Sequence, residues 1–71
     1  MARTSANQKL GSKIREQRQK LGLSQEKLGE LTGIDRTYIS GVERGNRNPA
    51  IKNLERLAKA LKVKVSDLID F

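Results

Sequence analysis

The stretch 25–44 (QEKLGELTGIDRTYISGVER) holds two short helical patterns separated by only three or four residues. The first pattern follows Ser24, a residue type that caps helix N-termini, and ends at Gly33 after about eight residues. The second follows Asp35, another residue type that caps helices, and ends at Gly45. Two short helices joined so closely must cross each other, and this requirement limits the folds open to the whole chain.

The side chains of this stretch indicate how the two helices cross. Gly29 has no side chain to keep the helices apart, and Gly33 can adopt the positive φ that a tight turn needs. Four apolar residues are expected to lock the second helix across the first: Leu28, Ile34, Ile39 and Val42. The pattern predicts a helix-turn-helix, in which the outer N-terminal face of the second helix can enter a major groove about 12 Å wide.

The rest of the 71-residue chain shows helical periodicity and no strand pattern. A first helix is expected over 7–21, with Leu10, Ile14 and Leu21 on one stripe, and a fourth carries apolar residues over 51–61. A last short helix is expected after a Ser66 cap. The predicted fold class is all-α, a compact bundle of five short helices. The predicted domains are a flexible N-terminal arm at 1–6 and a single DNA-binding domain at 7–71.

The charge and the residue types present narrow the function. Fifteen Lys and Arg against eight Asp and Glu give a net charge of +7, which favours a polyanionic partner, nucleic acid first. The chain has no cysteine and no histidine, so it lacks the commonest zinc ligands and the commonest general base. We therefore expect no enzyme, no metal and no cofactor. Only Tyr38 and Phe71 are aromatic, which argues against single-strand binding by base stacking.

No apolar run approaches the ~20 residues that span a membrane, and the N-terminus has no hydrophobic signal core. These features predict a cytoplasmic protein without a membrane partner.

The segment 25–44 resembles the helix-turn-helix of the Cro and phage-repressor family. Residues 35–48 (DRTYISGVERGNRN) resemble more narrowly the controller proteins of restriction–modification systems, and the resemblance covers residues 8–70. It implies a transcriptional regulator that binds double-stranded, palindromic operator DNA as a homodimer. It also implies control of a restriction–modification operon, by activation or repression, and a contact with RNA polymerase.

Three residues of the second helix of the motif are predicted to read bases: Arg36, Thr37 and Ser40. Arg36 can donate two hydrogen bonds to guanine O6 and N7, worth about 1–3 kcal/mol of discrimination, or it is simply solvated. Thr37 offers a hydroxyl or a methyl group to a base, or bonds only locally. Gly41 has no side chain with which to read a base.

Four further residues are predicted to contact the DNA backbone or the minor groove: Gln25, Tyr38, Arg47 and Asn48. The resemblance implies a phosphate contact for Gln25, where a solvent-exposed role is the alternative. Tyr38 combines a core ring with a hydroxyl that can reach a phosphate. The resemblance implies that Arg47 and Asn48 lie against the DNA backbone, and Arg47 can instead probe a narrow minor groove. A plain surface turn is the alternative for both residues.

Glu43 is expected to be structural, through an ion pair with a basic residue of the first helix such as Arg15 or Arg18, and a charge that faces phosphate is the alternative. The homodimer interface is predicted from apolar residues beyond the needs of a small core, unless these residues close the monomer core instead: Ile51, Leu61, Val63, Val65, Leu68, Ile69 and Phe71.

Other functions fit the sequence less well. A stand-alone phage-type repressor shares much of the motif. The DNA-binding antitoxin of a toxin–antitoxin pair uses the same fold, but such proteins usually add a toxin-wrapping segment that is not seen here. A non-specific DNA coat protein would not need the glycine-dependent motif.

Overall fold

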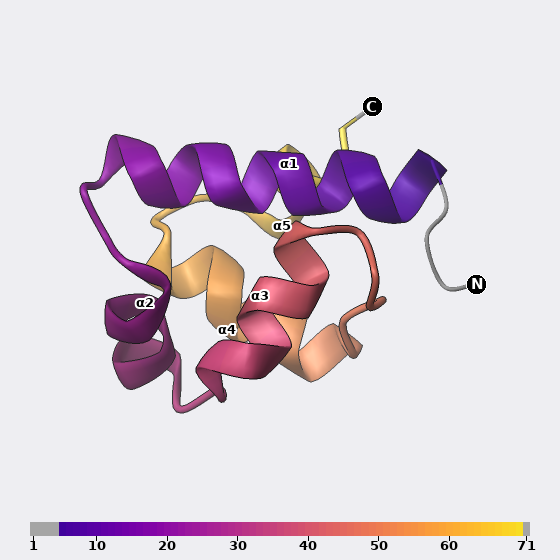
Figure 1. The fold of residues 1–71 in the computed structure, drawn as a ribbon. Helices are drawn as coiled ribbons and strands as arrows, with labels where there is room; N and C mark the ends of the chain where they lie inside the picture. The colour runs from indigo at the N-terminus through magenta and orange to yellow at the C-terminus, as the bar shows by residue number, and fades with distance from the viewer. Residues whose placement is uncertain (1–4, 71) are drawn as a thin grey trace.

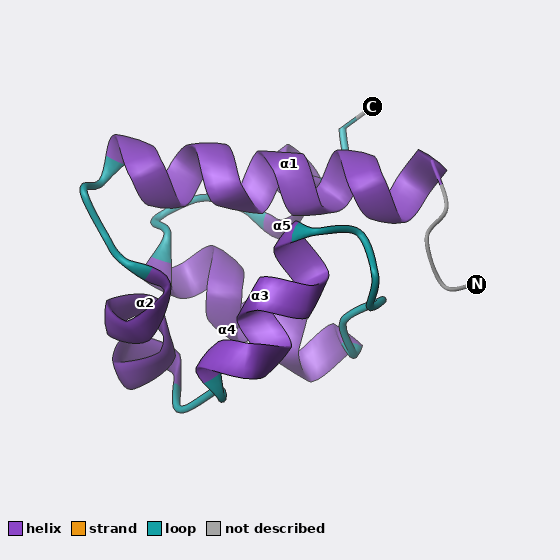
Figure 2. Ribbon diagram, viewed as in Figure 1, coloured by secondary structure: helices purple, strands orange, loops and turns teal. Residues whose placement is uncertain are grey.

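A computed structural model describes residues 5–70, which form five α-helices and no strand (Figures 1 and 2). The helices are α1 (Ser5–Lys20), α2 (Gln25–Thr32), α3 (Arg36–Glu43), α4 (Ile51–Ala60) and α5 (Val65–Leu68). The long helix α1 lies across the top of the view in Figure 1, and the shorter helices lie below and behind it. Over the described residues, the predicted all-α bundle of five helices is confirmed.

One apolar cluster joins the helices. α1 packs against α3 and α5, α2 packs against α3 and α4, and α4 also packs against α5. The buried members are Leu10, Ile14, Leu28, Ile34, Ile39, Val42, Leu54, Leu57, Ala58, Leu61 and Leu68. Three further apolar residues, Leu21, Leu31 and Ile51, are 41%, 54% and 70% exposed. Each lies at or just beyond a helix end, where the side chain extends past the core.

α1 and α3 meet at Gly11, a residue that the sequence pattern did not identify. A β-carbon at Gly11 would lie 2.7 Å from the carbonyl oxygen of Glu43 and would overlap the carbonyl oxygen of Val42. Only a residue without a side chain allows the two backbones to approach this closely. Gly11 therefore sets the distance between α1 and the C-terminal end of α3.

Local hydrogen bonds explain where the helices begin and end. The Ser24 hydroxyl accepts a hydrogen bond from the Lys27 amide at 2.9 Å, as its predicted cap role requires, and Gly33 has a φ of 74°. The predicted Ser66 cap is wrong. α5 begins at Val65, and the Asp67 carboxylate accepts the Lys64 amide hydrogen bond at 2.9 Å. An acidic side chain in the first turn thus satisfies a free N–H there.

The N-terminal boundary differs from the expectation in a simple way. α1 already includes residues 5 and 6, which the sequence placed in a flexible arm, and the rest of that arm lies outside the described residues. No helix in the described part of the chain is long and apolar enough to cross a membrane.

Candidate nucleic-acid interface

The turn between α2 and α3 folds tightly against α2. A β-carbon at Gly29 would lie 2.8 Å from the carbonyl oxygen of Ile34, so the missing side chain makes room for the turn. Asp35 then caps α3, because its Oδ1 accepts the Thr37 amide hydrogen bond at 2.7 Å. Ile39 and Val42 are fully buried and fix the rotation of α3 about its axis. The predicted helix-turn-helix is present with the expected anchors.

This rotation determines which side chains α3 presents outward. Arg36 and Thr37 are exposed in its first turn, and Ser40 lies one turn further along the same side, half-buried. The Arg36 side chain makes no hydrogen bond or ion pair with the described residues. Its guanidinium is therefore available for a ligand. Base reading by these three residues stays a prediction, and their placement is compatible with it.

Tyr38 holds the loop after α3 in place. Its hydroxyl oxygen accepts the Ala50 amide hydrogen bond at 3.0 Å, and its ring lies 4.9 Å below the guanidinium carbon of Arg47. A β-carbon at Gly41 would lie 3.5 Å from the Arg47 β-carbon, an ordinary contact distance, so Arg47 packs beside the Gly41 position of α3. Because Tyr38 accepts here, its own hydroxyl proton remains available to a phosphate. Asn48 is exposed in the same loop.

A charged network joins α1, α2 and α3. The Arg18 guanidinium donates two hydrogen bonds to the Glu43 carboxylate, at 2.7 and 2.9 Å, and one to the Leu23 carbonyl at 2.7 Å. The hydrogen bonding to Glu43 and the negative charge of that carboxylate raise the pKa of Arg18 above its ordinary value, although burial acts in the opposite direction. Of the two predicted partners for Glu43, Arg18 is the correct one.

Gln25 belongs to the same network. Its Nε2 donates a hydrogen bond to Glu43 Oε1 at 3.1 Å, which holds a half-buried side chain at the first residue of α2. The sequence pattern gave no sign of this bond, because the two residues lie on different helices. The predicted phosphate contact of Gln25 remains a prediction. Gln25 is the first residue of α2, and the free N–H groups at the start of a helix favour an anion.

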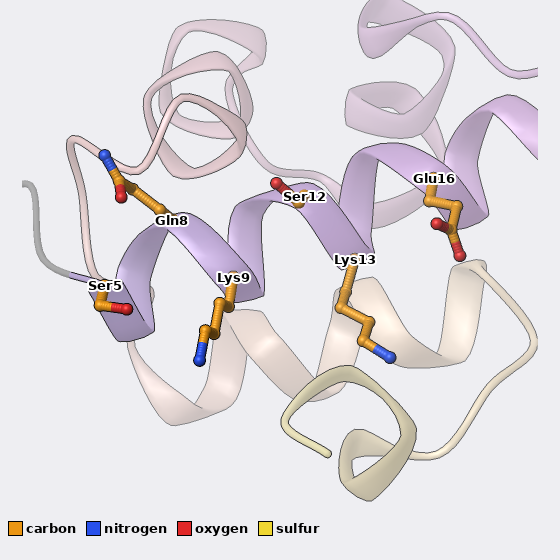
Figure 3. Close-up of a pocket in the computed structure, with 6 residues that line it drawn as sticks. All are labelled: Ser5, Gln8, Lys9, Ser12, Lys13 and Glu16. Atoms are coloured by element: carbon orange, nitrogen blue, oxygen red, sulfur yellow. The ribbon is translucent and has the colours of Figure 1, made fainter. Parts of the chain in front are cut away.

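A hollow of about 370 Å³ lies along α1 (Figure 3). Its lining residues are Ser5, Gln8, Lys9, Ser12, Lys13 and Glu16, all from this one helix. In the close-up, Lys9 and Lys13 extend from the same side of α1. Gln8 packs against the turn after α3, because a β-carbon at Gly45 would lie 2.8 Å from the Gln8 Cγ. The start of α1 thus lies beside the end of α3.

The six predicted dimer residues that the structure describes separate into three groups by exposure. Leu61 and Leu68 are 2% and 0% exposed and belong to the monomer core, so their assignment to a dimer interface is corrected here. Both side chains belong to the one buried apolar cluster that joins the helices. Ile51 and Ile69 are exposed.

Val63 and Val65 are half-buried and pack on the core cluster. Phe71 lies outside the described residues.

Comparisons with known proteins agree with this architecture. A helix-turn-helix family model matches residues 14–68. The control protein C.BamHI of Bacillus amyloliquefaciens is 48% identical over 62 residues, which are 86% of this chain and 76% of that protein.

Two solved structures are similar over most of the chain. The restriction-modification controller protein C.AhdI from Aeromonas hydrophila has a TM-score of 0.88 and 45% identity, covering 92% of this chain and 98% of that one. The P22 c2 repressor, solved with a synthetic operator, has a TM-score of 0.81 and 37% identity, covering 84% and 91%.

Proposed function

The chain belongs to the helix-turn-helix family, and from this premise we propose that it is a DNA-binding transcriptional regulator that controls a restriction–modification operon. The observation that carries the proposal is the likeness to controller proteins, which extends over nearly the full length of this chain and of C.AhdI. A likeness of that extent includes the helix-turn-helix and the helices that support it. The protein would act on DNA in the cytoplasm.

Sequence recognition rests on the first turn of α3. In this proposal Arg36 donates two hydrogen bonds to a guanine, and Thr37 and Ser40 complete the base contacts in the major groove. Gln25 and the start of α2 bind phosphate, together with Tyr38. Arg47 and Asn48 lie against the backbone or the minor groove. The stacking of Arg47 on Tyr38 and the bond between Gln25 and Glu43 support this assignment, since each side chain has a partner that positions it within the protein.

Two copies would bind a palindromic operator. Two half-sites about one helical turn apart require two α3 helices related by a twofold axis. Of the predicted dimer residues that the structure describes, Ile51 and Ile69 are exposed and available for the contact between the copies. Regulation would then follow from where the dimer lies relative to a promoter, by excluding RNA polymerase or by contacting it.

A stand-alone phage-type repressor is the second candidate function. The likeness to the operator-bound P22 c2 repressor favours it. Both functions use the same reading helix, so the regulated genes distinguish them.

Selection of binding sequences from a random DNA pool by the wild-type protein tests the proposal. We expect a palindromic site with a guanine at a fixed position in each half, and a match to that site beside restriction and methyltransferase genes in the source genome. The Arg36→Ala/Thr37→Ala double variant is the control, and it should not enrich the same site. Failure of the wild-type protein to enrich any sequence would refute specific recognition, and a match beside unrelated genes would favour the stand-alone repressor.

A further inference from the structure

A second hollow, of about 490 Å³, lies where α2 and α4 pack together. It is lined by Leu31, Thr32, Arg56, Lys59, Ala60 and Lys62, which we call the α2–α4 groove, and no residue of α3 lines it. Leu31 is 54% exposed, and Ala60 is half-buried beside it. The groove therefore joins an exposed apolar side chain to three cationic ones.

The three cations of the α2–α4 groove have no partner among the described residues. Arg56, Lys59 and Lys62 make no ion pair, and their side chains make no hydrogen bond. Two other surface lysines do have acidic neighbours, in the pairs Lys20–Glu16 at 3.7 Å and Lys27–Glu30 at 3.8 Å. Like charges gathered around a hollow repel one another and attract an anionic group.

Lys62 has an unusual backbone conformation. Its φ of 62° is the left-handed region, and among the described residues it is the one non-glycine residue there, while three glycines hold the other such positions. It follows the C-terminal end of α4, where glycine is the usual and less strained residue. A lysine at this position places a cation at the groove in spite of the strain.

We propose that the α2–α4 groove docks an acidic segment of a partner protein that carries one apolar side chain. The apolar side chain would cover Leu31 and Ala60, and carboxylates would pair with Arg56, Lys59 and Lys62. A protein segment fits better than a phosphate backbone, because phosphates offer no apolar group to cover the exposed leucine. This function is separate from base reading and does not depend on it.

Amide chemical shifts of the ¹⁵N-labelled full chain test the proposal. The probe is a seven-residue peptide of Asp and Glu around a central leucine. We expect shifts at the amides of Leu31, Thr32, Ala60 and Lys62, with no change along α3. The same peptide with serine in place of leucine should bind about fivefold more weakly, since it buries less apolar surface.

Two variants separate docking from folding. Lys62→Gly removes a cation and relieves the strained φ, so the protein should unfold at the same or a higher temperature while the peptide binds about fivefold more weakly. Leu31→Ser changes an exposed side chain and should weaken the binding of the leucine peptide but not that of the serine peptide. The control is Lys52→Ala, an exposed lysine of α4 outside the groove, which should change the affinity by less than about twofold.

Four results would overturn the proposal. The first is peptide-induced shifts on α3 in place of the groove, and the second is a Lys62→Gly variant that binds as tightly as the wild type. The third is a random-sequence DNA duplex that shifts the groove amides as strongly as the peptide, which would make the groove a phosphate surface. The fourth is groove shifts that change with protein concentration alone, which would make the occupant a second copy of the chain.

Discussion

Arg36 and Tyr38 lie two residues apart on α3, but only the Tyr38 side chain has partners among the described residues. Tyr38 accepts a hydrogen bond from the Ala50 amide and stacks on Arg47, and its hydroxyl proton stays available to a phosphate. Arg36 is exposed, and its side chain makes no ion pair or hydrogen bond with the described residues. A substitution of Arg36 should therefore alter DNA recognition without altering the fold.

Replacing Arg36 by alanine is expected to relax sequence preference at one position of each half-site by about 1–3 kcal/mol, because the two hydrogen bonds to guanine are lost. Competition binding against operator variants at fixed salt measures the effect. Arg15→Ala, an exposed basic residue of α1, is the matched control and should weaken all sequences alike. An unchanged preferred sequence in the Arg36→Ala variant would show that this residue does not read the base.

Replacing Gly11 by alanine is expected to lower the free energy of unfolding by about 1–3 kcal/mol, because α1 and α3 must separate to admit a methyl group. The new β-carbon would otherwise lie 2.7 Å from the Glu43 carbonyl oxygen. Urea denaturation measures the loss. Ser12→Ala, at the exposed neighbouring position, should stay within about 0.5 kcal/mol of the wild type. Equal stability of the two variants would mean that the crossing is not tight at Gly11.

At the scale of the helices, much of the fold could be predicted because its signals are local. Ser24, Gly33 and Asp35 mark the ends of α2 and α3 by residue type alone, and Ile39 and Val42 indicate the buried face by spacing. These signals need no knowledge of neighbouring helices. They also determine that Arg36 and Thr37 face outward, so the main part of the candidate site followed from the sequence.

What could not be predicted depends on contacts between distant segments. Leu61 and Leu68 are apolar by residue type, but the sequence pattern could not show whether they lie in the monomer core or in a dimer interface. Gly11 has no local signal, because its role requires the position of α3. The bond between Gln25 and Glu43 likewise joins two helices. Lys62 carries no signal either, since nothing in a lysine indicates a positive φ.

The ion pair between Arg18 and Glu43 joins α1 to α3. The Arg18 and Glu43 side chains are 12% and 3% exposed, so Glu43→Ala leaves a largely buried guanidinium with no carboxylate. We expect a loss of about 3 kcal/mol in the free energy of unfolding. The Arg18→Met/Glu43→Leu double variant should lose less than the sum of the single variants, since it leaves no unpaired charge.

The exposed pair between Lys20 and Glu16, where the side chains are 64% and 62% exposed, is the control for this cycle. Glu16→Ala should cost no more than about 0.5 kcal/mol. Strictly additive losses in the Arg18 and Glu43 variants would contradict a coupled pair.

For the whole protein, the net positive charge opposes formation of the predicted dimer. Each copy carries a net charge of +7, so two copies repel until an apolar contact or DNA holds them together. Added salt screens that repulsion and also weakens the attraction to phosphates. Self-association should therefore strengthen with salt over a range in which DNA binding weakens.

Substitutions at an exposed and at a buried apolar residue should distinguish the dimer interface from the monomer core. Ile51 is 70% exposed, so Ile51→Asp should leave the unfolding temperature of the monomer nearly unchanged while raising the dimer dissociation constant at least about tenfold. Leu68 is fully buried, so Leu68→Ala should cost about 2–5 kcal/mol of folding free energy. Sedimentation velocity and thermal unfolding on the same samples measure both quantities. An Ile51→Asp protein that still sediments as a dimer would place the interface elsewhere, with Ile69 the next apolar surface to vary.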